Sequence, residues 1–189
     1  ADCRAERIYF RSSPDLNANY AAATAIVSAF GIERSRALKA LESFQGVEHR
    51  MEKVLEFKGI LFVNDSKSTT TEATVWALKN ISAPVILIAG GREKGNDYSV
   101  VRELARNRVK RAFLIGESRE NISLAFAGKV KTDFSSTLKE AVERAFNAAS
   151  PGDCVLFSPM CKSFDMFMNF EERGISFKSA VMELANLKK

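Results

Sequence analysis

The sequence has few of the residues that build disulfide or metal sites. Its 189 residues include three cysteines, Cys3, Cys154 and Cys161, and one histidine, His49. The cysteines form no C-x-x-C pair and their number is odd, which argues against a disulfide framework or a zinc site. We therefore expect free thiols in a reducing compartment and no metal ligands in this chain.

Long apolar runs are also missing. A helix that crosses a bilayer needs about 20 apolar residues, whereas the apolar run at 21–30 is interrupted by Thr24 and Ser28. The first ten residues, ADCRAERIYF, contain no apolar core of a secretory signal peptide. These absences predict a cytoplasmic protein with no membrane partner.

The charge balance does not suggest a nucleic-acid binder. Lysine and arginine number 28 against 23 acidic residues, so the net charge is +5, and the two signs are mixed along the chain. No aromatic and basic platform accompanies this mild excess, so we expect no nucleic-acid partner. Charged residues at 27% and hydrophobic residues at 46% are typical of a folded globular protein. The length predicts one domain and part of a second.

The sequence of the N-terminal part, residues 1–48, predicts few elements, and these are not expected to fold independently. A short strand is expected at 6–10, and helices are expected at 17–30 and 33–44, the first capped by Asn17 or Asn19. These elements bury too little apolar surface for their own core, so we expect them to lean on another part of a protein. The stripe expected to face inward on the first helix is Tyr20, Ala23, Ile26, Val27 and Phe30.

From residue 49 to residue 189 the pattern changes to alternating strands and helices. Two β-rich runs around Lys58-Gly59 predict a hairpin. Later apolar strands are separated by amphipathic helices, which indicates a doubly wound α/β fold with a mostly parallel sheet. The expected strands are 85–90, 112–116, 129–132 and 154–158, and the expected helices are 98–107, 118–127, 136–149 and 174–187.

Ligands of such sheets lie outside the carboxyl ends of the strands. This rule selects the loops at 64–71, 89–98, 116–119 and 158–170.

The first of these loops reads N-D-S-K-S-T-T-T before a helix. Asp65 suits a ribose hydroxyl or a metal-bound water, Lys67 suits a phosphate, and the hydroxyls of residues 68–71 lie at a helix N-terminus that favours anions. The alternative is that the threonines only cap the helix, and the spacing alone leaves both interpretations open.

The loop A-G-G-R-E-K-G-N-D-Y is a weaker signal. Gly90 and Gly91 allow a close backbone approach, and Arg92 and Lys94 make the loop suitable for a carboxylate or a phosphate. The loop matches neither the P-loop nor the dinucleotide fingerprint, so a solvated turn is equally compatible with it.

The segment 158–174 mixes hydroxyls with aromatic and methionine side chains. Ser158 and Ser163 are small hydroxyls near a strand end, whereas Phe167 and Met168 are expected in the core. Asp165 could cap a helix.

Three further residues have a structural interpretation beside a functional one. Cys161 has no evident partner base and is not expected to be a nucleophile. The pair His49-Arg50 could be solvated, although a lone histidine is usually structural, or Arg50 could reach a phosphate from a domain junction.

Together these motifs resemble the Mur ligase family, in the branch that adds D-glutamate. The motifs are G-V-E-H-R-M-E-K-V, N-D-S-K-S-T, I-L-I-A-G-G-x-x-K-G and S-P-x-C-x-S-F-D-x-F-x-N-F-E-x-R-G-x-x-F, in family order over residues 17–185. The resemblance implies a ligase of peptidoglycan precursor synthesis that joins UDP-MurNAc-L-Ala to D-glutamate, using ATP and Mg²⁺, through an acyl phosphate. It implies that residues 1–48 are the tail of a central ATP-binding domain and residues 49–189 the C-terminal domain.

The resemblance also implies roles for single residues. Arg50 would contact the nucleotide phosphates and Asp65 the ribose, and Lys67 and Arg50 would serve catalysis. Lys67 would also bind D-glutamate, together with Thr69, Lys94, Ser163 and Phe170.

Some positions depart from the family pattern. Ser68 and Thr70 stand where alanine and asparagine are common, and only Asn19 of the segment 15–19 fits the usual asparagine pattern. These residues include no P-loop and no UDP-sugar domain, so we expect the chain alone to be inactive and to depend on the central and N-terminal domains of a longer ligase. A stand-alone module that binds an acidic amino acid or a nucleotide is the alternative.

Overall fold

A computed structural model describes residues 8–12, 18–44 and 46–188 of the chain. The chain divides into two units, Ala1–Gln45 and Gly46–Lys189. Each unit is described by itself below.

The first unit contains two helices, α1 (Ala18–Ala29) and α2 (Arg34–Glu42). Residues 8–10 form no strand, so that part of the expected strand is wrong, and residues 6 and 7 lie outside the described residues. Asn19 lies within α1 and does not cap it, while the other candidate cap, Asn17, is outside the described part.

The expected inward stripe of α1 is also wrong. The buried residues are Ala21 and Thr24, whereas Ile26 and Phe30 are 60% and 83% exposed. Tyr20, Ala23 and Val27 of the expected stripe are half-buried.

The second unit begins with the predicted hairpin. Strand β1 (Glu52–Phe57) pairs antiparallel with β2 (Ile60–Asn64). Lys58 and Gly59 join them, with φ values of 51° and 73°. Two consecutive positive φ values are typical of the type I′ turn, which matches the twist of a two-residue hairpin.

The hairpin forms one edge of a six-stranded sheet of order β1-β2-β6-β3-β4-β5, in which every pairing after the hairpin is parallel. This confirms the predicted doubly wound α/β fold. The remaining elements are α3 (Thr71–Asn80), β3 (Val85–Gly90), α4 (Ser99–Arg108), β4 (Val109–Ile115), α5 (Arg119–Phe126), β5 (Lys131–Phe134), α6 (Leu138–Ala148), β6 (Cys154–Phe157) and α7 (Phe170–Leu187).

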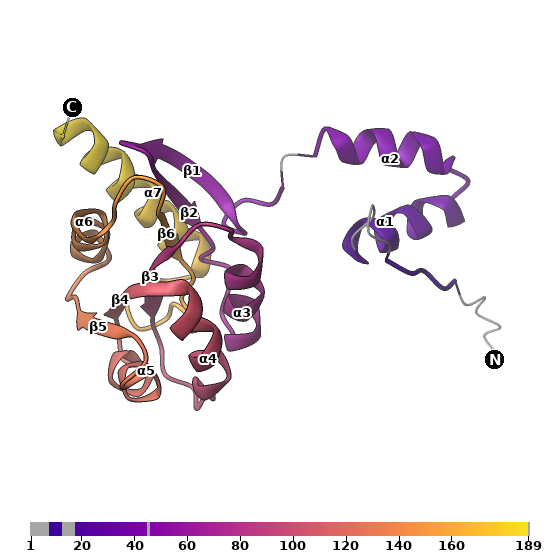
Figure 1. Ribbon diagram of the computed structural model, residues 1–189. Helices are drawn as coiled ribbons and strands as arrows, with labels where there is room; N and C mark the ends of the chain where they lie inside the picture. The colour runs from indigo at the N-terminus through magenta and orange to yellow at the C-terminus, as the bar shows by residue number, and fades with distance from the viewer. Residues whose placement is uncertain (1–7, 13–17, 45, 189) are drawn as a thin grey trace. The chain divides into compact units, whose positions relative to one another are not determined.

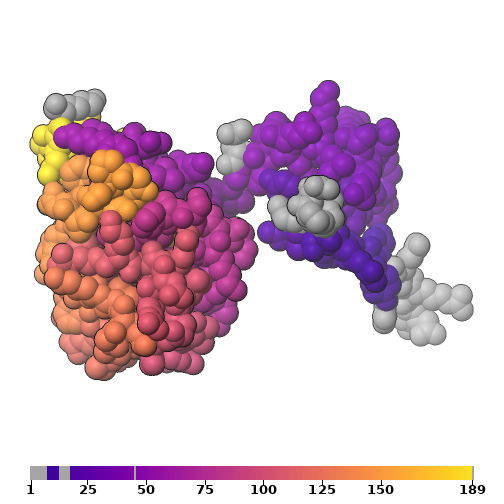
Figure 2. Space-filling model, in the orientation of Figure 1, coloured from indigo at the N-terminus to yellow at the C-terminus, as the bar shows by residue number. Residues whose placement is uncertain are grey.

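Helices cover both faces of the sheet, as Figure 1 shows. One core lies between the sheet and α3, α4 and α5, and the other lies between the sheet and α6 and α7. Alternate residues of β3 pack into different cores: Leu87 packs into the first, and Ile86 and Ile88 pack into the second. In the space-filling view the unit is a closely packed body (Figure 2).

Strand β6 enters the sheet between β2 and β3 and leads to α7 on the second face, whereas β3 leads to α4 on the first face. The helices that follow these two neighbouring strands therefore lie on opposite faces of the sheet. Doubly wound sheets hold ligands at such a switch point.

Two expectations for the C-terminal segment need correction. Helix α7 begins at Phe170, four residues before the predicted start, because Asn169 caps it. Met168 is 81% exposed and does not belong to the core, whereas Phe167 packs against the core of α6 and α7. In the described part of the chain no helix is both long and apolar enough to span a bilayer.

Candidate functional site

Backbone hydrogen bonds join three of the predicted loops at the carboxyl ends of β2, β3 and β6. The N–H of Met160 donates to the C=O of Ser68 at 3.0 Å, and the N–H of Gly90 donates to the C=O of Pro159 at 2.9 Å. Arg92 and Lys162 form an isolated antiparallel bridge. The loops therefore present their side chains from a shared, hydrogen-bonded rim.

Gly91 lies where this rim leaves no space for a side chain. A Cβ atom there would come within 2.4 Å of the carbonyl oxygen of Lys162, and the φ of Gly91 is 152°. The sequence interpretation of Gly91 as a point of close backbone approach is therefore confirmed.

Asp65 lies at the base of the rim and is 2% exposed. Its carboxylate accepts hydrogen bonds from the Ser158 hydroxyl at 2.9 Å, from the Met51 N–H at 3.2 Å and from the Ser68 hydroxyl. Burial raises the pKa of Asp65 above 3.8, while these donors and the charge of Arg50 oppose the rise. A carboxylate has about four lone-pair positions, so one further hydroxyl can still donate to it.

A pocket of about 160 Å³ opens beside Asp65. It is lined by Arg50, Asp65, Lys67, Ser68, Ala73 and Trp76. The structure thus brings together the three residues that the resemblance assigned to a nucleotide and to catalysis. Two cations and one carboxylate are a suitable donor and acceptor set for a phosphate next to a sugar hydroxyl.

Phe170 places an aromatic ring next to this pocket. The Nζ atom of Lys67 lies 4.6 Å from the centre of the Phe170 ring, within the distance of a cation–π contact. The ring also meets His49 edge-on, with 6.3 Å between the ring centres. Phe170, the first residue of α7, therefore contacts the side chain of Lys67.

The N-terminus of α3 shows that part of the threonine run is a helix cap. The Thr70 hydroxyl accepts a hydrogen bond from the N–H of Ala73. Thr69 is half-buried, and its hydroxyl is not used in that cap. The capping interpretation is therefore confirmed for Thr70, and the interpretation of Thr69 as a ligand contact stays a prediction.

Lys94 lies near the same helix end. The pKa of Glu72, the second residue of α3, is lowered by the N–H of Glu72 and the Thr70 hydroxyl, and Lys94 contributes a smaller effect through its charge. The Lys94 side chain is exposed, so it is free to meet a carboxylate above the rim.

Ser163 is placed differently from the exposed cations. It is 2% exposed, and its carbonyl accepts hydrogen bonds from the N–H groups of Met166 and Phe167. It therefore belongs to a tight turn just before Phe170. The structure groups Arg50, Asp65 and Lys67 at one pocket. Thr69, Lys94 and Ser163 lie on loops that follow β2, β3 and β6, and Phe170 is the first residue of α7.

The sequence reasoning did not single out Arg173, which is 1% exposed. Its guanidinium donates to the Ser66 carbonyl at 2.7 Å, to the Ser66 hydroxyl at 3.0 Å and to the Cys161 carbonyl at 3.0 Å. Burial lowers the pKa of Arg173 to about 10. Arg173 thus ties the loop that carries Lys67 to the loop after β6.

Arg173 could have been found from the R-G pair at 173–174. Gly174 is required there because a Cβ atom would come within 2.2 Å of the His49 ring. A glycine inside a helical pattern signals such a close approach.

His49 has a structural role. It is 3% exposed, and its Nδ1 atom accepts a hydrogen bond from the Asn64 side chain at 3.0 Å. Its ligand atoms lie close to those of Glu48 and Glu52. However, Lys178 already pairs with both carboxylates, so this cluster is a hydrogen-bonded ion network. The interpretation of His49 as solvated is wrong, whereas Arg50 is exposed.

Cys161 and Asp165 are also structural. The Cys161 thiol is buried, its pKa is raised by that burial, and it lies within hydrogen-bond distance of Tyr98 and Ser118. Asp165 accepts a hydrogen bond from the Glu117 N–H at 3.1 Å, so the interpretation of Asp165 as a helix cap is wrong.

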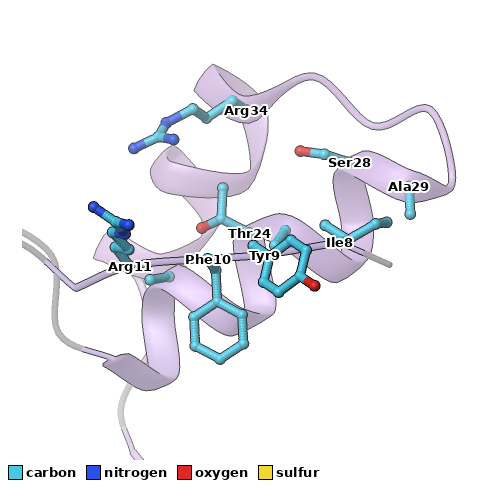
Figure 3. A pocket seen from close by; sticks show the side chains of 10 residues that line it. Ile8, Tyr9, Phe10, Arg11, Thr24, Ser28, Ala29 and Arg34 are labelled. Atoms are coloured by element: carbon cyan, nitrogen blue, oxygen red, sulfur yellow. The ribbon is translucent and has the colours of Figure 1, made fainter. Parts of the chain in front are cut away.

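A larger hollow of about 480 Å³ lies within the first unit. Figure 3 shows the side chains of residues 8–11 and of the two helices around it. Arg11 and Arg34 are its charged lining residues. None of the residues singled out from the sequence as ligand contacts lies there, so we do not take it as the functional site.

Comparison with known protein families identifies relatives of this arrangement. The family model described as "Mur ligase, glutamate ligase domain" matches residues 49–161. A UDP-N-acetylmuramoylalanine–D-glutamate ligase from Chlorobium limicola is 48% identical over 166 residues, which cover 88% of this chain and 36% of that protein. The protein of the same name from Pelodictyon phaeoclathratiforme is 45% identical over 168 residues, with shares of 89% and 36%. The chain therefore spans little more than a third of the length of these relatives.

Solved structures show the same fold at low sequence identity. A MurF ligase from Thermotoga maritima in complex with ADP has a TM-score of 0.65 and 16% identity, covering 90% of this chain and 38% of that one. An Escherichia coli FolC in complex with ADP has a TM-score of 0.63 and 16% identity, with shares of 90% and 39%.

Proposed function

Because the chain belongs to the Mur ligase family, we propose that it is the C-terminal part of a ligase that adds D-glutamate to UDP-MurNAc-L-Ala. In this proposal residues 1–48 are the tail of a central ATP-binding domain, and residues 49–189 are the glutamate-binding domain of a cytoplasmic enzyme of peptidoglycan synthesis. The observation that carries the proposal is the pocket that unites Arg50, Asp65 and Lys67 at the switch point of the sheet.

The pocket residues suit the nucleotide that the proposal requires. The guanidinium of Arg50 can pair with phosphate oxygens in a bidentate manner, and the remaining lone pair of Asp65 can accept a ribose hydroxyl. ATP would supply the phosphoryl group that activates the substrate carboxylate as an acyl phosphate. Asp65 is the one carboxylate that lines this pocket and is already bonded to three donors, so we assign no Mg²⁺ ligand here.

D-glutamate brings two carboxylates, and the surrounding loops offer groups to hold them. We propose that Lys67 and Lys94 pair with these carboxylates, with help from Thr69 and Ser163, and that Phe170 keeps Lys67 in position. Amide formation is then mainly a matter of holding an amine next to an acyl phosphate while the cations stabilise the developing charge.

A chimeric enzyme tests the proposal directly. The segment of the Chlorobium limicola ligase that aligns with this chain would be replaced by it, and phosphate release would be measured with UDP-MurNAc-L-Ala, D-glutamate and ATP. We expect turnover that depends on D-glutamate, and we expect none from the 189-residue chain alone. A folded chimera that binds D-glutamate or ADP without turnover would instead support a binding module.

The chimera also tests the two lysines. Lys67→Ala and Lys94→Ala should each raise the KM for D-glutamate or lower kcat, because each removes a cation that faces a carboxylate. Lys79→Ala, an exposed change at the far end of α3, is the control. Wild-type kinetics in both lysine variants would contradict the assigned roles.

A further inference from the structure

Trp76 lies on α3 with 52% of its surface exposed. Its neighbours Ala77 and Leu78 are fully buried in the core, so the helix turns its small and aliphatic residues inward and its largest aromatic outward. Trp76 is the single tryptophan of the sequence. An exposed tryptophan needs a reason, because leaving its large apolar surface in water gains nothing for folding.

The position of Trp76 supplies that reason, because its side chain lines the same pocket as Arg50, Asp65 and Lys67. The lining therefore combines cations, a carboxylate that can accept a hydroxyl, and an aromatic plane. These three chemistries correspond to the phosphate, the ribose and the base of a nucleotide. A volume of about 160 Å³ is well below that of a complete small-molecule site, so only part of a nucleotide can enter while the rest stays at the mouth.

We propose that Trp76 stacks against the base of the nucleotide and so forms the base-binding wall of this pocket. This inference rests on the proposed function, to which it adds a residue that selects an aromatic base. Indole is a large, rigid stacking surface, and stacking accepts any base because each one has a π-face. The backbone of Trp76 is held by the helix, and its carbonyl accepts a hydrogen bond from the Asn80 side chain at 2.8 Å. The helix therefore holds the backbone of this residue in place before the ligand arrives.

Because Trp76 is the single tryptophan, the indole fluorescence of the chain reports on this residue alone. We expect ADP to quench the emission in a saturable manner. Ribose 5-phosphate and pyrophosphate, which lack the base, should leave it nearly unchanged. Saturable ADP binding in equilibrium dialysis without any change in emission would overturn the proposal, as would the absence of saturable ADP binding.

Variants separate stacking from simple apolar contact. Trp76→Leu keeps an apolar side chain and loses the π-face, so it should weaken ADP binding about tenfold. Trp76→Phe should recover most of the affinity. Val100→Ala on α4, where the valine is also 52% exposed, is the matched control and should bind like wild type. Saturation-transfer NMR on the base protons of ADP provides the measurement for variants without tryptophan. Equal affinities for the Leu and Phe variants would argue against stacking.

Kinetics of the chimeric ligase separate this inference from the proposed function. If both are right, Trp76→Leu raises the KM for ATP and leaves kcat and the KM for D-glutamate unchanged, because stacking is equally strong in the ground and transition states. If the chimera is active and Trp76→Leu does not change its KM for ATP, the inference is contradicted and the proposed function is not. A saturable ADP quench in the 189-residue chain, together with a folded chimera that never turns over, would support the inference and contradict the proposed function.

Discussion

At the scale of single residues, the carboxylate of Asp65 is buried and three donors point at its oxygens. Burial raises its pKa, so the folded state holds the proton more tightly than the unfolded chain does. As the pH rises from about 3.8 through the raised pKa, the unfolded chain loses its proton first. The ionised carboxylate therefore makes the folded state less stable across this window.

Asp65→Asn tests this sign. The free energy of unfolding of the wild type, minus that of Asp65→Asn, should decrease as the pH rises through the window and level off above it. Urea unfolding at a series of pH values gives the measurement, and only the slope is interpreted because the amide also changes the hydrogen bonds.

Asp97→Asn is the control of opposite sign. The Ser99 hydroxyl and N–H lower the pKa of Asp97. The contribution of Asp97 to the stability of the folded state is therefore present above pH 3.8 and is lost as the pH falls through the lowered pKa. Parallel slopes for the two variants would contradict the assignment of burial as the cause at Asp65.

Arg173 makes a second prediction at this scale. Arg173→Met leaves the Ser66 hydroxyl and the carbonyls of Ser66 and Cys161 without their donor. Since each buried unsatisfied group costs about 1–3 kcal/mol, we expect a loss of about 3 kcal/mol in the free energy of unfolding. Arg106→Met, at an exposed position, should change stability by less than about 0.5 kcal/mol. A similarly small effect of Arg173→Met would show that water replaces the guanidinium.

The residues of the site show what a sequence can and cannot predict. Asp65 and Lys67 could be predicted as site residues because their loop directly follows a strand, and the topology of the sheet then brings this loop to the switch point. Trp76 and Arg173 could not be predicted as site residues, because in a helical pattern an aromatic residue fits a core stripe and a basic residue fits a solvated face. Only the register of α3 and α7 against the sheet decides that Trp76 is exposed and Arg173 is buried.

At the scale of elements, side-chain caps fix where three helices of the second unit begin. Thr70 caps α3, Thr137 caps α6 and Asn169 caps α7. The cap of α7 is reinforced by Glu172, which accepts a hydrogen bond from the N–H of Met168 at 2.7 Å while its own N–H donates to Asn169, also at 2.7 Å. The start of α7 matters because its first residue, Phe170, contacts Lys67.

Asn169→Ala should therefore have two effects. It should cost about 1 kcal/mol of stability, as for other N-caps, and it should loosen the contact between Phe170 and Lys67. Asn169→Asp keeps the acceptor and adds a charge that suits a helix N-terminus, so it is the matched control. Urea unfolding measures the first effect, and the line width of the Phe170 ring signals in NMR measures the second. Equal stability of the alanine and aspartate variants would contradict the capping role.

The boundaries of the elements show the limits of pattern reading. Strands β3, β4 and β6 were predictable because parallel strands covered on both faces are continuously apolar. The edge strand β5 is polar and begins two residues later than the predicted strand at 129–132. The apolar pattern predicts that α7 starts at residue 174, whereas the pair Asn169 and Glu172 marks the actual start at Phe170. The stripe of α1 failed for another reason: with five apolar side chains on a small unit, periodicity cannot tell which face is covered.

At the scale of the whole molecule, the two units differ in how much they bury. The second unit has apolar cores on both faces of its sheet. The described helices of the first unit bury Ala21 and Thr24 on α1 and Ala37 on α2. Large apolar side chains such as Phe30 and Ile26 remain exposed there. Three small buried side chains cannot offset the chain entropy of the described residues of this unit, which costs about 1–2 kcal/mol for each residue ordered.

We therefore expect residues 46–189 to fold without residues 1–45. The shortened chain should unfold in urea at the same midpoint and with the same slope as the full chain, because that slope follows the surface exposed on unfolding and the core of the second unit supplies most of it. Amide NMR spectra of the two chains should superimpose for the residues of the sheet. A lower midpoint in the shortened chain would show that the first unit stabilises the second. A second cooperative transition in the full chain alone would show that residues 1–45 have a core of their own, which would contradict both the sequence analysis and the burial in α1 and α2.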